Sequence, residues 1–219
     1  MNRSLMALSV LLAAVTVALP AFSATRKAVR SKPAKFELSA SEWGNVKEGK
    51  VTVRHVNKGQ VNEFYSAGYV KADVDDVFWY YEDHTNTPKY QNAIKKISVE
   101  EDKSPKRNAA SGEMGGYRRL MYQLVLPWPI GTRNFALDLE GQGEPGKAGD
   151  IWWSFNEGDI DEMMGSYVVT PYPTNRKWSL VRYWVMADMN TWIPGWLVGF
   201  VQGRTIPNVI EQARKDLEK

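Results

Sequence analysis

Apolar and polar positions alternate with a period of two through the middle of the chain. In 134–140, Phe135, Leu137 and Leu139 fall on one side and the more polar positions between them on the other. The segment 117–126 alternates in the same way, and this period is typical of a sheet with one face in water. Similar short segments cover 51–56, 62–70, 94–99, 151–155, 165–170 and 178–186, divided by turn-forming residues. The pattern predicts an antiparallel meander.

Two short helices are predicted near the start of this strand-rich region. Ser39 and Glu42 have the three-residue spacing of a capping box, which predicts a helix that ends near Lys47. Asp73 is placed to cap a second helix, which apolar residues at helical spacing carry through Tyr81.

The segment 194–218 predicts one long C-terminal helix with two apolar faces. One face holds Ile193, Trp196, Leu197, Phe200 and Val201; the other holds Ile206, Val209, Ile210, Ala213 and Leu217, continued upward by Gly195, Gly199 and Gly203. Pro207 lies where the two patterns meet, so we expect a kink or a break there. The glycines indicate either close packing against the sheet or free volume over a cavity, and they make the helix easier to loosen.

The N-terminal segment has the pattern of a cleavable secretory signal peptide. Arg3 is the only charged residue before position 26, an apolar run covers 5–19, and small residues lie at Ala21 and Ser23. Pro20 ends the run short of the roughly 20 apolar residues that a spanning helix needs, although an uncleaved anchor is the alternative. We expect a signal peptide over 1–23, a flexible basic leader over 24–36, one domain over 37–219, and a periplasmic or secreted protein.

Composition narrows the classes of function. The chain of 219 residues has no Cys and a formal net charge of +3, with nine Trp and ten Tyr. The absence of Cys excludes a disulfide scaffold, thiol nucleophiles and thiolate metal sites. The near balance of charge argues against a nucleic-acid partner. The many aromatic side chains either fill a core or line a cavity for a large apolar ligand.

The sequence offers little for catalysis. His55 and His84 are the only histidines, and neither has a second ligand at metal spacing. Nucleophile elbows, phosphate loops and dinucleotide-binding motifs are absent from the sequence. We therefore expect no catalytic residue, no metal and no cofactor.

Four motifs, spread over 49–218, support a family resemblance. They are GKVTV at 49–53 with VNEF at 61–64, DDVF at 75–78, Pro-Trp-Pro with Arg-Asn-Phe within 127–135, and IPGWLV at 193–198. Together they resemble the START family of lipid-transfer domains, relatives of the steroidogenic acute regulatory protein within the helix-grip superfamily. The chain departs from the family in having Arg133-Asn134 for Arg-Asp, and Asp188-Met189-Asn190-Thr191 for the usual Asp-Pro-Gly.

The resemblance implies an α+β helix-grip fold, in which a curved antiparallel sheet wraps around the C-terminal helix and encloses an apolar cavity. It implies non-covalent binding or carriage of one hydrophobic molecule (a lipid, a sterol or a hopanoid-like terpenoid). Separately, an exposed Trp at Trp152-Trp153 would suit transient contact with a membrane surface, with core filling as the alternative, and we expect a monomer. Two alternatives stay open: a cyclase- or hydrolase-like enzyme for a bulky apolar substrate, and an envelope interaction module with a filled core.

Candidate pocket and lid residues follow from the strand faces and the C-terminal helix. They are Tyr122, Leu124, Phe135, Leu137, Trp153, Arg182, Trp184, Trp196, Gly199, Phe200, Gly203 and Arg204. Arg182 and Arg204 fall among apolar neighbours, where a charge is either paired with an acid or directed at the polar head of a ligand. Trp152 and Trp153 face opposite ways if their segment is a strand, so one is expected in the core or pocket and the other exposed or under a loop.

Overall fold

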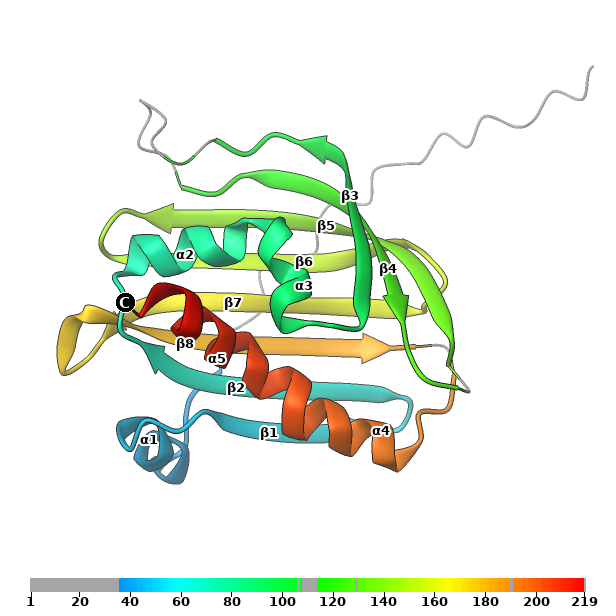
Figure 1. Cartoon of the computed structure of the whole chain (residues 1–219), viewed down its shortest axis with the longest axis horizontal. Helices are drawn as coiled ribbons and strands as arrows, with labels where there is room; N and C mark the ends of the chain where they lie inside the picture. Colours follow the sequence, from blue (N-terminus) through cyan, green and yellow to red (C-terminus); the bar gives the residue numbers. More distant parts are fainter. Residues whose placement is uncertain (1–35, 106, 108–113, 129, 190, 219) are drawn as a thin grey trace, which may run out of the picture.

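One curved antiparallel sheet forms the framework of the protein. The computed structural model describes residues 36–105, 107, 114–128, 130–189 and 191–218. Within this part the sheet has eight strands in the order β1-β2-β8-β7-β6-β5-β4-β3 (Figure 1). The strands are β1 (Thr52–Lys58), β2 (Val61–Val70), β3 (Ile94–Asp102), β4 (Tyr117–Val125), β5 (Thr132–Glu144), β6 (Ala148–Gly158), β7 (Glu162–Tyr172) and β8 (Asn175–Asp188). The predicted meander from β3 to β8 is confirmed, and β2 pairs with β8 to bring the first hairpin beside the last strand.

Helices cover the inner face of the sheet, and the helix-grip architecture is confirmed. They are α2 (Val74–Glu82), a 3-10 turn (His84–Asn86), α3 (Thr87–Tyr90), and a C-terminal helix made of α4 (Gly195–Phe200), a π-helical turn (Val201–Thr205) and α5 (Ile206–Leu217). Figure 1 shows α2, α3 and the C-terminal helix on the same side of the sheet. The main core lies between them, with Phe78, Val181 and Ile210 fully or almost fully buried.

The other face of the sheet carries a smaller core under α1 (Ala40–Lys47). Val46 of this helix packs with Ala67 and Leu180, all of them buried. Both faces of β2 and β8 are therefore covered by protein.

Both predicted helix starts are confirmed in detail. The Ser39 hydroxyl accepts a hydrogen bond from the Glu42 backbone N–H, and the Glu42 carboxylate accepts one from the Ser39 backbone N–H at 2.7 Å. The Asp73 carboxylate accepts a hydrogen bond from the Asp76 N–H at 2.8 Å. Each cap satisfies an N–H group that the first turn of a helix leaves unpaired.

The predicted interruption at Pro207 takes the form of the π-helical turn that precedes it. Proline has no N–H to donate to the carbonyl four residues back, and Pro207 lies in the first turn of α5. A π turn places one extra residue in the helix and so rotates the preceding part by about 100° relative to a regular α-helix. The predicted faces of the upper half are accordingly rotated.

This rotation corrects the two interpretations of the glycine stripe. Gly195, Gly199 and Gly203 are exposed, and a Cβ atom added at any of them would meet nothing within 4 Å. They neither pack against the sheet nor lie over a cavity. Leu197 takes the inward position instead and is 3% exposed.

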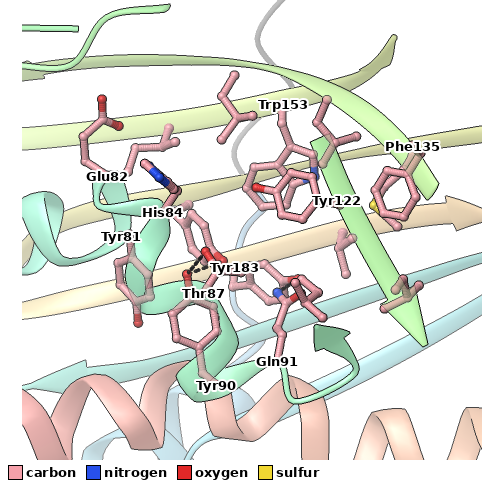
Figure 2. Close-up of a pocket in the computed structure, with 18 residues that line it drawn as sticks. Tyr81, Glu82, His84, Thr87, Tyr90, Gln91, Tyr122, Phe135, Trp153 and Tyr183 are labelled. Carbon is pink, nitrogen blue, oxygen red and sulfur yellow. Dashed lines mark hydrogen bonds between the residues drawn. The ribbon is translucent and has the colours of Figure 1, made fainter. Parts of the chain in front are cut away.

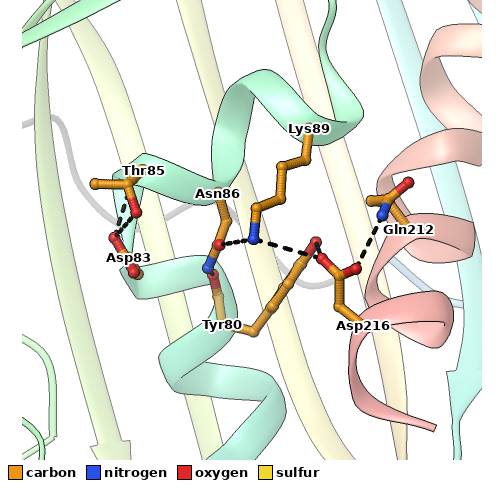
Figure 3. Close-up of polar contacts among 7 residues, drawn as sticks. All are labelled: Tyr80, Asp83, Thr85, Asn86, Lys89, Gln212 and Asp216. Atoms are coloured by element: carbon orange, nitrogen blue, oxygen red, sulfur yellow. Dashed lines mark hydrogen bonds and ion pairs between the residues drawn. The ribbon is translucent and has the colours of Figure 1, made fainter.

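Polar contacts hold the lower half of the C-terminal helix in place. The Asp216 carboxylate accepts hydrogen bonds from the Tyr80 hydroxyl at 3.0 Å and from Gln212 at 3.0 Å, and Lys89 lies 3.7 Å from it (Figure 3). Arg214 donates to the carbonyl of Tyr69 at 2.8 Å. In the described chain the side-chain hydrogen bonds of this helix all involve residues from 208 onward, so α4 is held by apolar contacts.

None of the helices in the described residues is long and apolar enough to cross a membrane. The predicted signal peptide and nearly all of the predicted leader lie outside the described residues.

Candidate ligand-binding cavity

A cavity of about 360 Å³ lies between the start of the C-terminal helix and the nearby ends of β2, β4 and β8; we call it the wide cavity. Its apolar lining is Phe64, Ala93, Leu124, Val125, Leu126, Pro127, Ile130, Met163, Val185, Ala187, Met189, Ile193, Leu197, Val198, Phe200, Val201 and Ile206. The polar residues at its wall are Asn62, Gln91, Asn92, Tyr183 and Thr205. Such a wall suits the body of a hydrophobic molecule.

A second cavity of about 90 Å³, the narrow cavity, lies between the α2–α3 segment and strands β4 to β8 (Figure 2). It is lined by Tyr81, Glu82, His84, Thr87, Tyr90, Gln91, Ile94, Tyr122, Leu124, Phe135, Leu137, Leu139, Ile151, Trp153, Met163, Tyr167, Tyr183 and Val185. Gln91, Leu124, Met163, Tyr183 and Val185 line both cavities, so the two volumes adjoin.

The alternation of side chains along the strands places aromatic rings at the wall of the narrow cavity. Tyr122 and Phe135 are paired across β4 and β5, and their rings stack with centroids 5.7 Å apart. Trp153, Tyr167 and Tyr183 come from the neighbouring strands β6, β7 and β8, with ring centroids between 5.0 and 6.1 Å apart. Ring-to-ring packing fixes these side chains on rigid strands, which leaves a shaped space.

A glycine makes room for the largest of these rings. Gly165 on β7 is the direct partner of Trp153 on β6. A Cβ atom at position 165 would collide with the Trp153 indole ring. The absence of a side chain there lets the indole lie close to β7 at the cavity wall.

Most tyrosine hydroxyls of the narrow cavity bond to protein groups. Tyr167 donates to the Tyr90 hydroxyl at 3.5 Å, and Tyr90 shares a 3.3 Å hydrogen bond with Thr87. The Tyr183 hydroxyl accepts from Gln91 at 3.5 Å, and Tyr81 donates to the carbonyl of Val209 at 3.1 Å. Burial raises the pKa of each of these tyrosines, so all are uncharged at neutral pH.

Charge is confined to one end of the narrow cavity. Glu82 is almost fully buried, and burial raises its pKa to about 7 even though Arg118 lies 3.0 Å away and opposes the shift. Burial also lowers the pKa of His84. Lys and Arg are absent from the described lining of both cavities, and no three of His, Asp and Glu group together as metal ligands in the described residues.

The structure places half of the predicted site residues at these walls. Tyr122, Leu124, Phe135, Leu137 and Trp153 line the narrow cavity, Leu124 and Phe200 line the wide one, and their contact with a ligand stays a prediction. Trp152, on the opposite face from Trp153, is also buried.

Arg182 and Trp184 point the other way, which corrects their assignment to the pocket. Their neighbours Tyr183 and Val185 line the cavities, so alternation along β8 sends Arg182 and Trp184 to the opposite face. Because both faces of β8 are covered, its apolar pattern did not reveal which one meets the cavity.

The remaining lid candidates lie on the outer side of the C-terminal helix. Trp196 is 58% exposed, Gly199 and Gly203 face open space, and Arg204 is exposed with its guanidinium 5.8 Å from the Phe200 ring. None of these four lines either cavity in the described structure. The extra residue of the π turn explains the misplacement.

Sequence reasoning missed the residues that α3 and its flanks contribute. Thr87, Tyr90 and Gln91 belong to a four-residue helix and its C-cap, which are too short to produce a periodic signal. Tyr167 and Tyr183 could have been found, since each lies two residues from a fully buried valine, Val169 or Val181, and therefore on the same face of its strand.

The raised pKa of Glu82 predicts a specific pH dependence of stability. The folded state holds the Glu82 proton more tightly than the unfolded state. The contribution of this proton to the free energy of unfolding is therefore complete below about pH 4.5 and is lost as the pH rises through about 7. Relative to wild type, Glu82→Gln should gain up to about 3 kcal/mol in free energy of unfolding across that window. Urea denaturation at a series of pH values measures the difference. The control is Glu157→Gln, on an exposed residue that lines neither cavity. If the difference in stability between Glu82→Gln and wild type does not change with pH, the assignment is contradicted.

Comparison with known proteins rests on structure, because no protein-family model matches the sequence. A search of curated proteins also finds no match. Among solved structures, a STAR-related lipid transfer protein (fragment 25–204) from Xanthomonas axonopodis is 19% identical, with a TM-score of 0.57 and an alignment that covers 78% of this chain and 95% of that one.

Two human structures are similar as well. The lipid transfer and protein localization domain of human StarD13 is 13% identical, with 83% of this chain and 98% of that chain covered and a TM-score of 0.54. Human StAR-related lipid transfer protein 5 is 9% identical, with 81% and 90% covered and a TM-score of 0.53. At these identities the likeness establishes the fold alone: the chain has the helix-grip fold of START lipid-transfer domains, as its four motifs predict.

Proposed function

We propose that this protein is an exported, non-enzymatic carrier of one hydrophobic molecule, such as a lipid, a sterol or a hopanoid-like terpenoid. The wide cavity is the observation that carries the proposal. Its volume of about 360 Å³ falls within the usual range for ligand pockets, about 300–1,000 Å³, and its wall is predominantly apolar. The structural neighbours described as lipid transfer proteins support the same reading.

The size of the wide cavity and the lining of both cavities also argue against the two alternative functions, a filled-core interaction module and an enzyme. A module with a filled core leaves a space of this size unexplained, because protein interiors pack with few voids larger than a water molecule. An enzyme would need converging ionisable groups near the substrate. In the described lining, Glu82 and His84 supply the only ionisable groups other than tyrosine, and Glu82 is paired with Arg118. We therefore favour binding and carriage.

Filling the wide cavity should weaken ligand binding. Ala187 on β8 lines this cavity, so Ala187→Trp should lower the affinity for the neutral apolar dye Nile red by about tenfold or more, since tenfold corresponds to about 1.4 kcal/mol. Native mass spectrometry of the purified wild-type protein should show a retained apolar molecule that the variant lacks.

Ala40→Trp provides the matched control, because Ala40 is exposed on α1. It should leave dye affinity and the retained mass unchanged. A wild-type protein that is empty after purification and binds neither Nile red nor lipid would contradict the proposed function.

Transient contact with a membrane is the second part of the proposal, and it rests on exposed aromatic side chains at the wide cavity. Trp128, Trp192, Trp196 and Phe200, here called the aromatic rim, are 86%, 73%, 58% and 48% exposed. Each is a lining residue or the direct neighbour of one. Exposed apolar groups gathered at a ligand site are typical of interaction surfaces, and Trp favours the membrane–water interface.

Removing two tryptophans of the aromatic rim should weaken docking to vesicles without weakening ligand binding in solution. Trp128→Ser combined with Trp192→Ser should lower vesicle affinity by about tenfold or more in co-sedimentation, because two large apolar groups no longer enter the interface. Nile red affinity in solution should stay unchanged, since neither tryptophan lines a cavity. As a control, Val99→Ser removes an apolar residue that is 44% exposed on β3. If Val99→Ser loses as much vesicle affinity as the double tryptophan variant, the aromatic rim has no specific role in docking.

Export is the third part of the proposal and follows from the sequence pattern of residues 1–23. Full-length protein expressed in a bacterial host should be recovered from the periplasmic fraction with a mass that starts within a residue or two of Ala24. Leu11→Arg places a charge in the apolar run and should leave uncleaved precursor in the cytoplasm. Uncleaved wild-type protein in the membrane fraction would favour an anchor instead.

A further inference from the structure

We propose that the carried molecule has one uncharged, hydrogen-bond-accepting group, an alcohol or carbonyl oxygen, which the Tyr122 hydroxyl and the Trp153 indole N–H hold in the narrow cavity. The apolar body of the same molecule then occupies the wide cavity. This inference rests on the proposed function and specifies the chemical class and the orientation of the ligand.

Two donors without protein partners carry the inference. Tyr122 and Trp153 are each 7% exposed and line the narrow cavity, into which both extend from the sheet (Figure 2). Within the described chain, neither the Tyr122 hydroxyl nor the Trp153 N–H has a hydrogen-bond partner. Once an apolar ligand fills the cavity, water no longer reaches these donors, and a buried donor left unpaired costs about 1–3 kcal/mol.

The neighbouring tyrosines show that pairing is the rule in this cavity. Tyr90 and Tyr167 bond to each other, Tyr81 bonds to the carbonyl of Val209, and Tyr183 bonds to Gln91. Tyr122 lines the same cavity and differs from them in keeping its hydroxyl free of protein partners. An acceptor supplied by the ligand would complete the pattern.

The electrostatics of the wall select an uncharged acceptor. In the described lining no Lys or Arg faces either cavity, so a carboxylate or phosphate would be buried without a counter-charge. Glu82, at the end of the narrow cavity, would repel an anion when ionised, and its own charge is already paired with Arg118. Burial raises the pKa of Tyr122, so its hydroxyl keeps the proton that it would donate.

The two donors are also held in fixed positions. The Tyr122 ring stacks on Phe135 at an interplanar angle of 11°, and Trp153 lies against Tyr167 and opposite the bare backbone of Gly165. Both come from strands rather than loops. Donors held this way lose little conformational freedom when they bind an acceptor.

Three probes with one C18 chain test the choice of head group: octadecan-1-ol, octadecane and octadecanoate, each measured by displacement of Nile red. Wild-type protein should bind octadecan-1-ol more tightly than the other two. Tyr122→Phe, which removes only the hydroxyl, should lower the affinity for octadecan-1-ol about five- to tenfold and leave octadecane unchanged, as expected for one hydrogen bond.

Tyr80→Phe is the matched control, because the Tyr80 hydroxyl is bonded to Asp216 and lies outside both cavities. It should leave the ratio of alcohol to alkane affinity as in wild type. If Tyr122→Phe leaves that ratio unchanged, or if octadecanoate binds most tightly, the head-group inference is overturned while the carrier function stands. If no probe displaces Nile red and the dye itself does not bind, the proposed function fails as well.

A measurement on the wild-type protein alone guards against a variant that does not fold. The carbonyl stretch of bound octadecan-2-one, isotopically labelled at the carbonyl carbon, should lie at a lower frequency than in hexane because the oxygen accepts hydrogen bonds. A bound ketone with its hexane frequency would overturn the inference.

Discussion

The close contact between α5 and β2 is the interaction on which the rest of the structure depends. Gly68 of β2 leaves space for this approach, since a Cβ atom there would lie 3.2 Å from the Ile210 side chain and 3.3 Å from Arg214. Arg214 then donates to the carbonyls of Tyr69 and Gly49, which fixes the helix to the first hairpin. The helix is thus held close to the sheet at its C-terminal end. The wide cavity lies away from this anchor, toward α4, and the narrow cavity lies under the α2–α3 segment.

The π turn divides the C-terminal helix into two parts, of which only the lower one is anchored to β2. Below it, Val209 and Ile210 are fully buried against the sheet. Above it, the rotated phase brings Leu197 and Val198 to the wall of the wide cavity and turns Trp196 outward. Three exposed glycines, each about 1 kcal/mol less favourable than alanine in a helix, weaken the upper half further. A segment with these properties can loosen while α5 stays in place, which is what passage of a buried ligand requires.

What could be predicted from the sequence was decided by how local each feature is. The capping box at Ser39 and the cap at Asp73 act within a single turn, so both helix starts were predicted correctly. Alternation located the strands and placed Tyr122, Phe135 and Trp153 at the cavity wall. The face of β8 could not be assigned, because apolar residues cover both of its sides. The phase of α4 depends on one extra residue in a π turn: Pro207 marks the interruption, but no pattern in the sequence shows that a residue is added there.

The polarity of the site has a consequence for how a ligand would enter and leave. An oxygen held by Tyr122 and Trp153 lies in the narrow cavity, so the apolar body of the ligand points through the wide cavity toward the aromatic rim. In water this body is covered by α4, whose inner side chains are apolar. When the rim enters a membrane, the end of the ligand that emerges first is the hydrophobic one, and lipid receives it without exposure to water. On these two proposals the hydrogen bonds at the head would break last, so the end of the wide cavity at the aromatic rim would control access and the narrow cavity would select the ligand.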